Sequence, residues 1–181
     1  MALAQGSGVR FFQYRSKTGS RREIYETCLT LAQMAREAGS LFIVNDHADI
    51  AAAVGADGVH LGQDDLPLAD ARKVLGAGAI IGISTHNREQ AIAAEQGGAD
   101  YIGFGPVFPT STKDAGRIQG VEAVRLIRDA VQIPLVCIGG INQNNVLDVI
   151  SAGADAVAVI SGILSAPDLA QAAEDIVKLI S

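Results

Sequence analysis

A repeat of short apolar runs, each followed by a turn and a segment with helical periodicity, constrains the fold of this chain most strongly. The runs are rich in Val, Ile and Leu, and we expect strands at 9–14, 41–44, 58–61, 79–83, 101–104, 135–138 and 156–160. Because the runs are continuous rather than alternating, the strands should be covered on both faces, as in parallel sheets packed by helices. The pattern therefore predicts an α/β fold.

Two details of the connecting segments support this interpretation. The first helical segment carries an apolar stripe, predicted to be buried, that consists of Tyr25, Leu29, Leu31, Met34 and Ala35. Three later connections share a Gly-Ala-Asp sequence, in which the glycine is expected to cap a helix before Ala-Asp leads into the next strand. These are the segments VGADGV, GGADYI and AGADAV, which begin at Val54, Gly97 and Ala152.

The positions of the polar residues distinguish between two α/β architectures. An open doubly wound sheet would concentrate them at one switch point. Here they follow nearly every strand, which favours a TIM-type (β/α)8 barrel whose strand ends converge on one site. Seven strands are expected instead of eight, and the chain of 181 residues is shorter than the roughly 200 at the low end for this fold. Since the opening MALAQGSG looks like the end of a helix and its turn, we expect a single barrel domain, 1–181, that lacks the first strand and most of the first helix.

Charge and composition argue against several classes of function. The formal net charge is −6 and no basic run occurs, which argues against binding to nucleic acid or to an anionic membrane. No apolar run approaches the roughly 20 residues of a membrane span, and we expect a soluble, cytoplasmic protein. Cys28 and Cys137 lie in apolar stretches without metal-ligand spacing, so both are predicted to be buried thiols.

A loop after the fifth expected strand is the first candidate anion site. The strand 101–104 breaks at Gly105 and Pro106, and the chain then presents Thr110, Ser111, Thr112 and Lys113. Hydroxyls, free loop amides and an ammonium group suit a phosphorylated ligand, because each donates hydrogen bonds or positive charge to phosphoryl oxygens. The alternative is a solvated turn.

A second group of polar residues follows the earlier strands. Alternation places Gln13, Arg15 and Lys17 on one side of the first strand. Asp46 and Asp65 follow the next two strands, and two carboxylates beside cations suit a Mg²⁺ ion that also binds substrate phosphate. The alternative is that both aspartates cap helices.

Three further strand ends carry residues that fit either of two roles. Ser84 follows the fourth strand and either donates to an anion or caps the next helix. Gly139 and Gly140 follow the sixth strand, while Ser161 and Gly162 follow the last. Loops after the final two strands of such barrels often bind phosphate through backbone amides, although glycines also form ordinary tight turns.

Taken in order, seven segments resemble the thiamine phosphate synthase family: QYRSK, VNDHADIA, GVHLGQDDLP, IGISTHN, ADYIGFGPVFPTSTK, IGGIN and AGADAVAVISGI. The resemblance begins at about Val9 and covers nearly all of the chain from there. It implies a (β/α)8 barrel that joins 4-amino-2-methyl-5-hydroxymethylpyrimidine diphosphate to 4-methyl-5-hydroxyethylthiazole phosphate and releases pyrophosphate. It also implies Mg²⁺ as the cofactor and these two small molecules as the partners.

The resemblance assigns roles to individual positions. Those that match the pyrimidine diphosphate site are Gln13, Arg15, Lys17, Asn45, Ser84 and Lys113, with Tyr14 and Ser16 completing the motif. Asp46 and Asp65 match the magnesium ligands. Those that match the thiazole phosphate site are Thr110, Ser111, Thr112, Gly140, Ile160 and Ser161. His60 matches a position near the pyrimidine, and a packed neutral histidine is the alternative.

The implied reaction is an ionising alkyl transfer, in which the methylene–oxygen bond breaks first and the thiazole nitrogen traps the cation. Arg15, Lys17 and Lys113, together with Mg²⁺, would neutralise the leaving pyrophosphate and are the candidate catalytic residues. No Ser, Cys or His arrangement suggests covalent catalysis. Because a barrel without its first strand has two unpaired edges, we also expect the chain to self-associate.

Three other functions remain open at this point. A thiazole tautomerase-like enzyme shares the fold and the thiazole phosphate site but does not use the magnesium pair. A truncated, non-catalytic protein would bind the phosphate ligand without turnover. The third alternative is a phosphate-binding barrel enzyme that acts on a sugar phosphate, against which the two anion sites argue.

Overall fold

The computed structural model describes residues 7–110 and 117–181 and contains one sheet of seven parallel strands. The strands pair in sequence order: β1 (Phe11–Tyr14), β2 (Leu41–Asn45), β3 (Gly58–Leu61), β4 (Ile80–Thr85), β5 (Tyr101–Phe104), β6 (Leu135–Ile138) and β7 (Ala156–Ala158). The helices between and after them are α2 (Arg21–Glu37), α3 (Ala48–Val54), α4 (Leu68–Leu75), α5 (Arg88–Gln96), α6 (Val121–Arg128), α7 (Val146–Ser151), α8 (Ser161–Leu164) and α9 (Leu169–Ile180).

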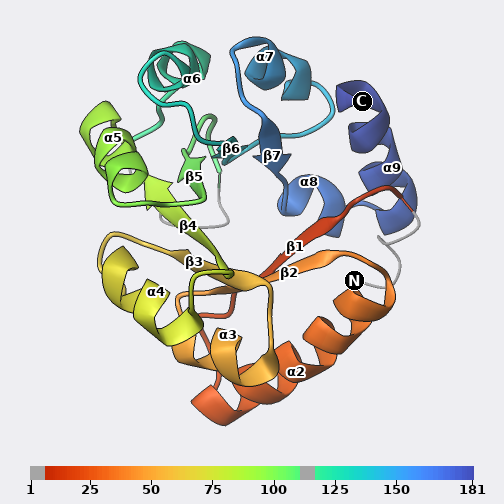
Figure 1. Ribbon diagram of the computed structural model, residues 1–181. Helices are drawn as coiled ribbons and strands as arrows, with labels where there is room; N and C mark the ends of the chain where they lie inside the picture. Colours follow the sequence, from red (N-terminus) through yellow and green to blue (C-terminus); the bar gives the residue numbers. More distant parts are fainter. Residues whose placement is uncertain (1–6, 111–116) are drawn as a thin grey trace.

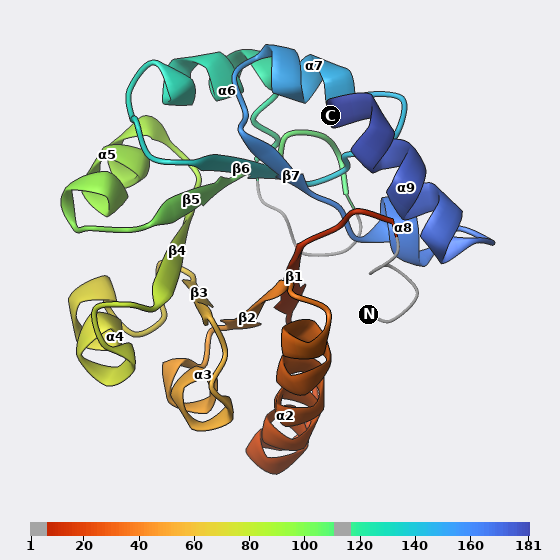
Figure 2. The ribbon, with the colours of Figure 1, turned by 45° about the vertical axis from the view of Figure 1, so that its right-hand side comes forward.

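The sheet curls, and most of the helices lie around its outside (Figure 1). This confirms the predicted α/β fold of TIM-barrel type with seven strands. Among the described residues β1 and β7 are the two edges of the sheet, and Figure 2 shows them with α8 and α9 nearby. None of the helices in the described part of the chain is both long and apolar enough to cross a membrane.

Alternate positions along each strand face two different environments. The first set packs against the helices, where Phe42, Val59, Ile81 and Leu135 are fully or almost fully buried. The second set faces the inside of the curled sheet and includes Ile43, His60, Ser84 and Tyr101. Both sets are covered, which explains why the strands read as continuous apolar runs.

The buried side of α2 differs from the predicted stripe. Tyr25 and Leu29 are exposed, and the residues that α2 buries are Ile24, Cys28, Ala32 and Ala35. Two of these are alanines and one is a cysteine, because the helix lies close to the sheet and small side chains fit there. Of the predicted stripe, Ala35 is buried and Leu31 is half-buried against the core, whereas the large side chains of Tyr25 and Leu29 are exposed. Cys28 and Cys137 are both free and buried, as predicted, and burial raises the pKa of the Cys28 thiol to about 11.

The three Gly-Ala-Asp segments make the same contact at the amino ends of neighbouring strands. In each segment the glycine has positive φ, and the aspartate that follows turns back to the preceding strand. The carboxylates of Asp57, Asp100 and Asp155 each accept a hydrogen bond of 2.8 Å, from the backbone N–H of Phe42, Ile81 and Leu135 respectively. We call these three contacts the carboxylate clasps. Each clasp ties two neighbouring parallel strands together where the first of them begins.

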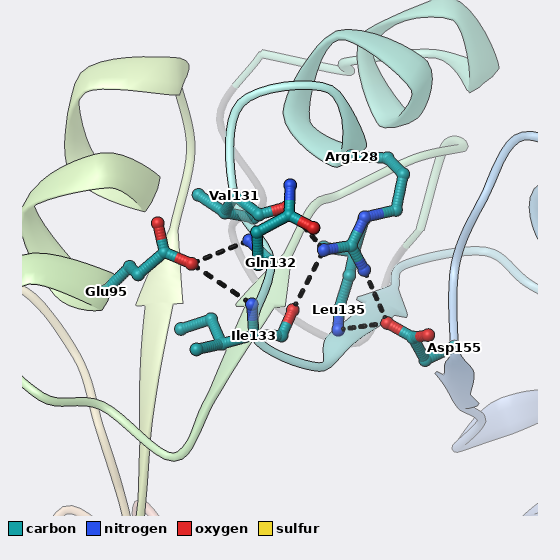
Figure 3. A network of polar contacts seen from close by, with 7 residues as sticks. All are labelled: Glu95, Arg128, Val131, Gln132, Ile133, Leu135 and Asp155. Atoms are coloured by element: carbon teal, nitrogen blue, oxygen red, sulfur yellow. Dashed lines mark hydrogen bonds and ion pairs between the residues drawn. The ribbon is translucent and has the colours of Figure 1, made fainter.

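Arginine side chains from the preceding helices reinforce two of the clasps. Arg128, at the end of α6, donates to Asp155 at 2.7 Å, and Arg72 on α4 donates to Asp100 at 2.6 Å. Arg128 also donates to the carbonyl oxygens of Val131 and Ile133 (Figure 3). One guanidinium group therefore connects the end of a helix, the following loop and the clasp. In the first repeat Arg36 donates to the carbonyl oxygen of Gly55 instead.

The clasp of Asp155 should contribute more to stability than an ordinary surface ion pair. Replacing Asp155 with Ala removes an arginine partner and leaves the N–H of Leu135 without its acceptor, so we expect a loss of about 1–2 kcal/mol in the free energy of unfolding. The matched control is Glu122→Ala, which breaks an exposed pair with Arg125 and should cost at most about 0.5 kcal/mol. Urea denaturation of both variants measures the difference, and equal losses would contradict the role of the clasp.

Candidate functional site

Polar side chains from neighbouring strands form a continuous chain at the carboxyl ends of β1, β2 and β3. The Nε2 of Gln13 donates to the Oδ1 of Asn45 at 2.6 Å, and the amide of Asn45 donates in turn to the carboxylate of Asp46. Asn45 is buried, so its amide needs these partners. The chain of hydrogen bonds fixes the direction in which Asp46 points.

Asp46 and Asp65 lie beside each other, and neither caps a helix. Helix α3 begins after His47 and α4 begins after Pro67, neither of which makes a side-chain capping bond. Asp46 has a φ of 66°, in the left-handed region that a residue with a side chain seldom adopts. Asp65 accepts a hydrogen bond of 2.6 Å from the N–H of Gly62, which holds its carboxylate at the mouth of the sheet. The capping alternative is therefore wrong for both aspartates.

The two carboxylates make the site electrostatically unfavourable without a cation. Partial burial raises the pKa of the Asp46 carboxyl, the neighbouring Asp65 raises it further, and the positive charge of Arg15 acts in the opposite direction. No ion pair joins either aspartate to Lys or Arg in the part of the chain that the structure describes. Two adjacent carboxylates with open coordination suit Mg²⁺, which commonly takes one or two carboxylates and completes its shell with water and phosphate oxygens. Clusters of three or more candidate ligands are absent from the described residues.

The other residues of the first strand end lie around this pair. Tyr14 is half-buried and packs against the core, while Arg15 follows it closely enough for its charge to act on Asp46. The hydroxyl of Ser16 donates to the carbonyl oxygen of Thr18, and Lys17 is exposed. The turn thus brings Arg15 to the carboxylates and leaves the ammonium group of Lys17 in solvent.

His60 and Ser84 lie deeper, on the inner face of β3 and β4. His60 is only 8% exposed, its Nδ1 is 2.9 Å from the hydroxyl of Tyr101, and its Nε2 is 2.8 Å from the Oγ of Ser84. Ser84 does not cap α5, because Asn87 caps that helix through a bond from the N–H of Gln90. The capping alternative is therefore wrong for Ser84 as well.

The ends of β5, β6 and β7 meet at a second place along the same rim. The N–H of Phe108 donates to the carbonyl oxygen of Gly139 at 3.0 Å. A Cβ atom added to Gly140, which has a φ of +65°, would lie 2.4 Å from the carbonyl oxygen of Pro109. A Cβ on Gly162 would lie 3.1 Å from the carbonyl oxygen of Ile141. The segment that leads to Thr110, the turn after β6 and the start of α8 are therefore in direct contact.

Two asparagines hold the turn after β6 in shape. The side-chain amides of Asn142 and Asn145 both donate to the carbonyl oxygen of Gly140, at 3.3 and 3.0 Å. Asn145 also accepts from the N–H of Asn142 at 2.8 Å. Ile160 is exposed and Ser161 begins α8, on the β7 side of this turn. The predicted site residues Ser111, Thr112 and Lys113 lie outside the described residues.

Sequence reasoning missed four residues that shape the site. Tyr101 binds His60, Gln63 donates to the carbonyl oxygen of Ser84 at 2.7 Å, and Asn142 and Asn145 hold Gly140. The sequence did offer a signal for the contact between Tyr101 and His60. Gly82 and Gly103 lie inside strands, where glycine often marks the close approach of another group.

Comparisons with known proteins agree on one family. The family model described as thiamine monophosphate synthase matches residues 1–163. A thiamine-phosphate synthase from Chloroflexus aurantiacus is 48% identical over 175 residues, which is 96% of this chain and 81% of the relative. Another from Shouchella clausii is 48% identical over 176 residues, covering 96% and 84%. The solved structure of a thiamine phosphate pyrophosphorylase from Pyrococcus furiosus has a TM-score of 0.92 and 44% identity, and the match covers 98% of this chain and 86% of that one.

Gly140 should be far less tolerant of a side chain than a glycine with the same backbone conformation elsewhere. Gly39 has a φ of +62° with no atom within 4 Å of an added Cβ, so Gly39→Ala should cost only the backbone strain of about 1–2 kcal/mol. Gly140→Ala adds a clash with Phe108 and Pro109, which should bring the loss in the free energy of unfolding to about 2–4 kcal/mol. Urea denaturation compares the two variants. Similar losses would show that the contact between the two loops is not tight.

Proposed function

The chain belongs to the thiamine-phosphate synthase family, whose members are transferases, and we propose that it forms thiamine phosphate at the carboxyl ends of its strands. In this proposal a hydroxymethylpyrimidine diphosphate is joined to a thiazole phosphate and pyrophosphate is released. The observation that carries the assignment to this rim is the carboxylate pair Asp46–Asp65. It lies at the strand ends, has a strained backbone at Asp46 and is surrounded by Gln13, Asn45 and Arg15.

The pyrimidine diphosphate would bind on the β1–β4 side of the rim. Gln13, Asn45 and Ser84 would supply neutral polar groups there, and Tyr14 and Ser16 complete the same strand end in this proposal. Arg15 and Lys17 supply positive charge, to which Lys113 would add in this proposal. Asp46 and Asp65 would hold Mg²⁺, and the bound ion would neutralise charge on the diphosphate as the leaving group departs.

The chemical step needs charge stabilisation and orientation from the protein. The bond between the methylene carbon and the diphosphate oxygen breaks, and its electron pair leaves with pyrophosphate. The thiazole nitrogen then supplies the electron pair of the new carbon–nitrogen bond. Arg15, Lys17 and Lys113 would stabilise the charge that develops on the departing oxygen, which is the catalytic role we assign to them. No side-chain nucleophile is needed, and the buried thiols of Cys28 and Cys137 are remote from such a role.

The thiazole phosphate would bind on the β5–β7 side, where Thr110, Gly140, Ile160 and Ser161 occupy adjoining strand ends. Ser111 and Thr112 belong to the same proposed site. The tight contacts at Gly140 and Gly162 support this placement, because they bring three loops into contact, and the backbone amides of such loops can bind a phosphate group. Anchoring the phosphate would hold the thiazole nitrogen within reach of the methylene carbon.

The alternative functions differ in what they require of the rim. A tautomerase-like enzyme would need the thiazole site but not Asp46 and Asp65, so the carboxylate pair favours the synthase. A sugar-phosphate enzyme would not account for two separate anion sites. A non-catalytic binding protein would bind thiazole phosphate without turnover, which a product assay separates from catalysis. Self-association stays a prediction, motivated by the two sheet edges among the described residues at β1 and β7.

Asp65 should make catalysis depend on magnesium. In Asp65→Asn one carboxylate charge is lost from the proposed metal site, so the Mg²⁺ concentration for half-maximal thiamine phosphate formation should rise about 10-fold or more. The matched control is Asp64→Asn, which removes the same charge from the adjacent, exposed residue and should leave the magnesium dependence nearly unchanged.

The measurement is a titration of product formation with Mg²⁺ for the unaltered chain and both variants. Equal titration curves for Asp65→Asn and the unaltered chain would exclude Asp65 as a metal ligand. Equal shifts for the two variants would mean that overall charge, rather than coordination, sets the dependence.

A further inference from the structure

Three inward-facing side chains on β3, β4 and β5 form one connected polar group beneath the proposed pyrimidine site. His60 pairs in register with Gly82, and Gly82 pairs with Tyr101, so the three positions lie side by side across the sheet. Ser84, two residues beyond Gly82, pairs with Gly103. Because Gly82 has no side chain, His60 and Tyr101 meet above it, and their ring centroids are 5.4 Å apart.

Both glycines are required by this arrangement. A Cβ atom on Gly82 would lie 2.0 Å from the Cζ of Tyr101, and one on Gly103 would lie 2.9 Å from the Cε1 of His60. Phe11 on β1 closes the other side, with its ring edge-on to that of Tyr101 at 5.6 Å. The strands therefore leave room for one phenol and one imidazole in a fixed orientation.

The phenol fixes the position of the proton on His60. Tyr101 is 6% exposed, and burial raises the pKa of its hydroxyl, so the group is a neutral phenol whose proton needs an acceptor. Among the residues that the structure describes, the hydroxyl's hydrogen-bonding partner is the Nδ1 of His60, 2.9 Å away. Tyr101 therefore donates to Nδ1, and a neutral His60 carries its proton on Nε2.

The position of the proton on His60 also determines the role of Ser84. The protonated Nε2 of His60 donates to the Oγ of Ser84 at 2.8 Å, so Ser84 is the acceptor in that bond. Its own hydroxyl proton then points elsewhere. Ser84 is only half-buried, in contrast to His60 and Tyr101, and lies near the carboxyl end of β4, at the rim of the site.

We propose that Tyr101 is a positioning residue, which acts through the tautomer of His60 to aim the hydroxyl proton of Ser84 at an acceptor atom of the pyrimidine diphosphate. The proposal rests on the proposed function, in which Ser84 contacts that substrate. Tyr101 itself does not touch the substrate. The relay runs from the phenol hydroxyl to Nδ1, and from Nε2–H to Oγ.

Tyr101→Phe tests this relay because it keeps the ring and removes only the donor. The phenylalanine ring cannot donate a hydrogen bond to Nδ1, so His60 in the variant should populate both tautomers. Long-range ¹H–¹⁵N correlation spectra of histidine-labelled protein should show the Nε2–H tautomer in the unaltered chain and a mixture in the variant. The spectrum of the unaltered chain needs no substitution, so it tests the tautomer even if the variant folds poorly. A protonated Nδ1 in that spectrum would overturn the proposal.

Kinetics test the effect on Ser84. Tyr101→Phe should lower kcat about 5–10-fold, the worth of one hydrogen bond, with little change in KM for the thiazole phosphate. Ser84→Ala should lower kcat as well, and the double variant should be no slower than Ser84→Ala alone, because Tyr101 acts only through Ser84. Independent, multiplying effects would overturn the relay.

A matched control separates this role from the loss of any buried hydroxyl. Thr85 is fully buried and donates to the carbonyl oxygen of Gly103 at 3.1 Å, next in sequence to Ser84 but on the opposite face of the strand. Thr85→Val should reduce stability without a change in the His60 spectrum. A complete lack of turnover by the unaltered chain would overturn the proposed function, while the spectra would still decide whether Tyr101 sets the tautomer.

Discussion

The shared direction of the seven strands is the constraint on which the rest of this structure depends. Because every strand runs the same way, residues that follow separate strands meet at one rim, and residues that precede the strands meet at the other. The two rims carry different chemistry. The carboxylate clasps of Asp57, Asp100 and Asp155 tie neighbouring strands at the amino ends. The carboxyl ends carry the carboxylates and amides of the proposed active site, so the stabilising contacts and the proposed catalytic groups lie at opposite ends of one sheet.

The inner face of the sheet, between its two rims, contains a polar layer. Gly82 and Gly103 supply no side chains, and the space they leave is filled by the rings of Tyr101 and His60. A conventional apolar layer would fill the same volume without hydrogen-bonding demands. The polar layer also fixes the direction of its hydrogen bonds. Because each buried hydrogen-bond donor needs an acceptor, Tyr101 donates to His60 and His60 donates to Ser84. That series of hydrogen bonds ends at Ser84, at the edge of the proposed substrate site.

The sequence was sufficient to predict the strands, their parallel arrangement and the meeting of Asp46 and Asp65, since these follow from apolar runs and from the shared strand direction. The sequence was less informative where side-chain size determines which face of a helix is buried, or where contacting residues lie far apart in the chain. The buried side of α2 was predicted correctly at Ala35 but not at Ala32 and Cys28, whose small side chains give weak apolar signals. Tyr101 was interpreted only as part of an apolar strand, because its partner lies two strands away and is identified only by the register of β3, β4 and β5. Asn142 and Asn145 lie only two and five residues from Gly140, and they were missed because the turn was interpreted through its glycines alone.

We propose above all that this one chain joins the two substrates at a magnesium-dependent site on the carboxyl ends of its strands. The most direct measurement is the simultaneous quantification of thiamine phosphate and pyrophosphate, with both substrates present, with each omitted, and with Mg²⁺ supplied or chelated. Equal amounts of the two products are expected, formed only when both substrates and Mg²⁺ are present. Equal yields after chelation of the metal would contradict the role of the carboxylate pair, and binding of thiazole phosphate without either product would identify a non-catalytic binding protein.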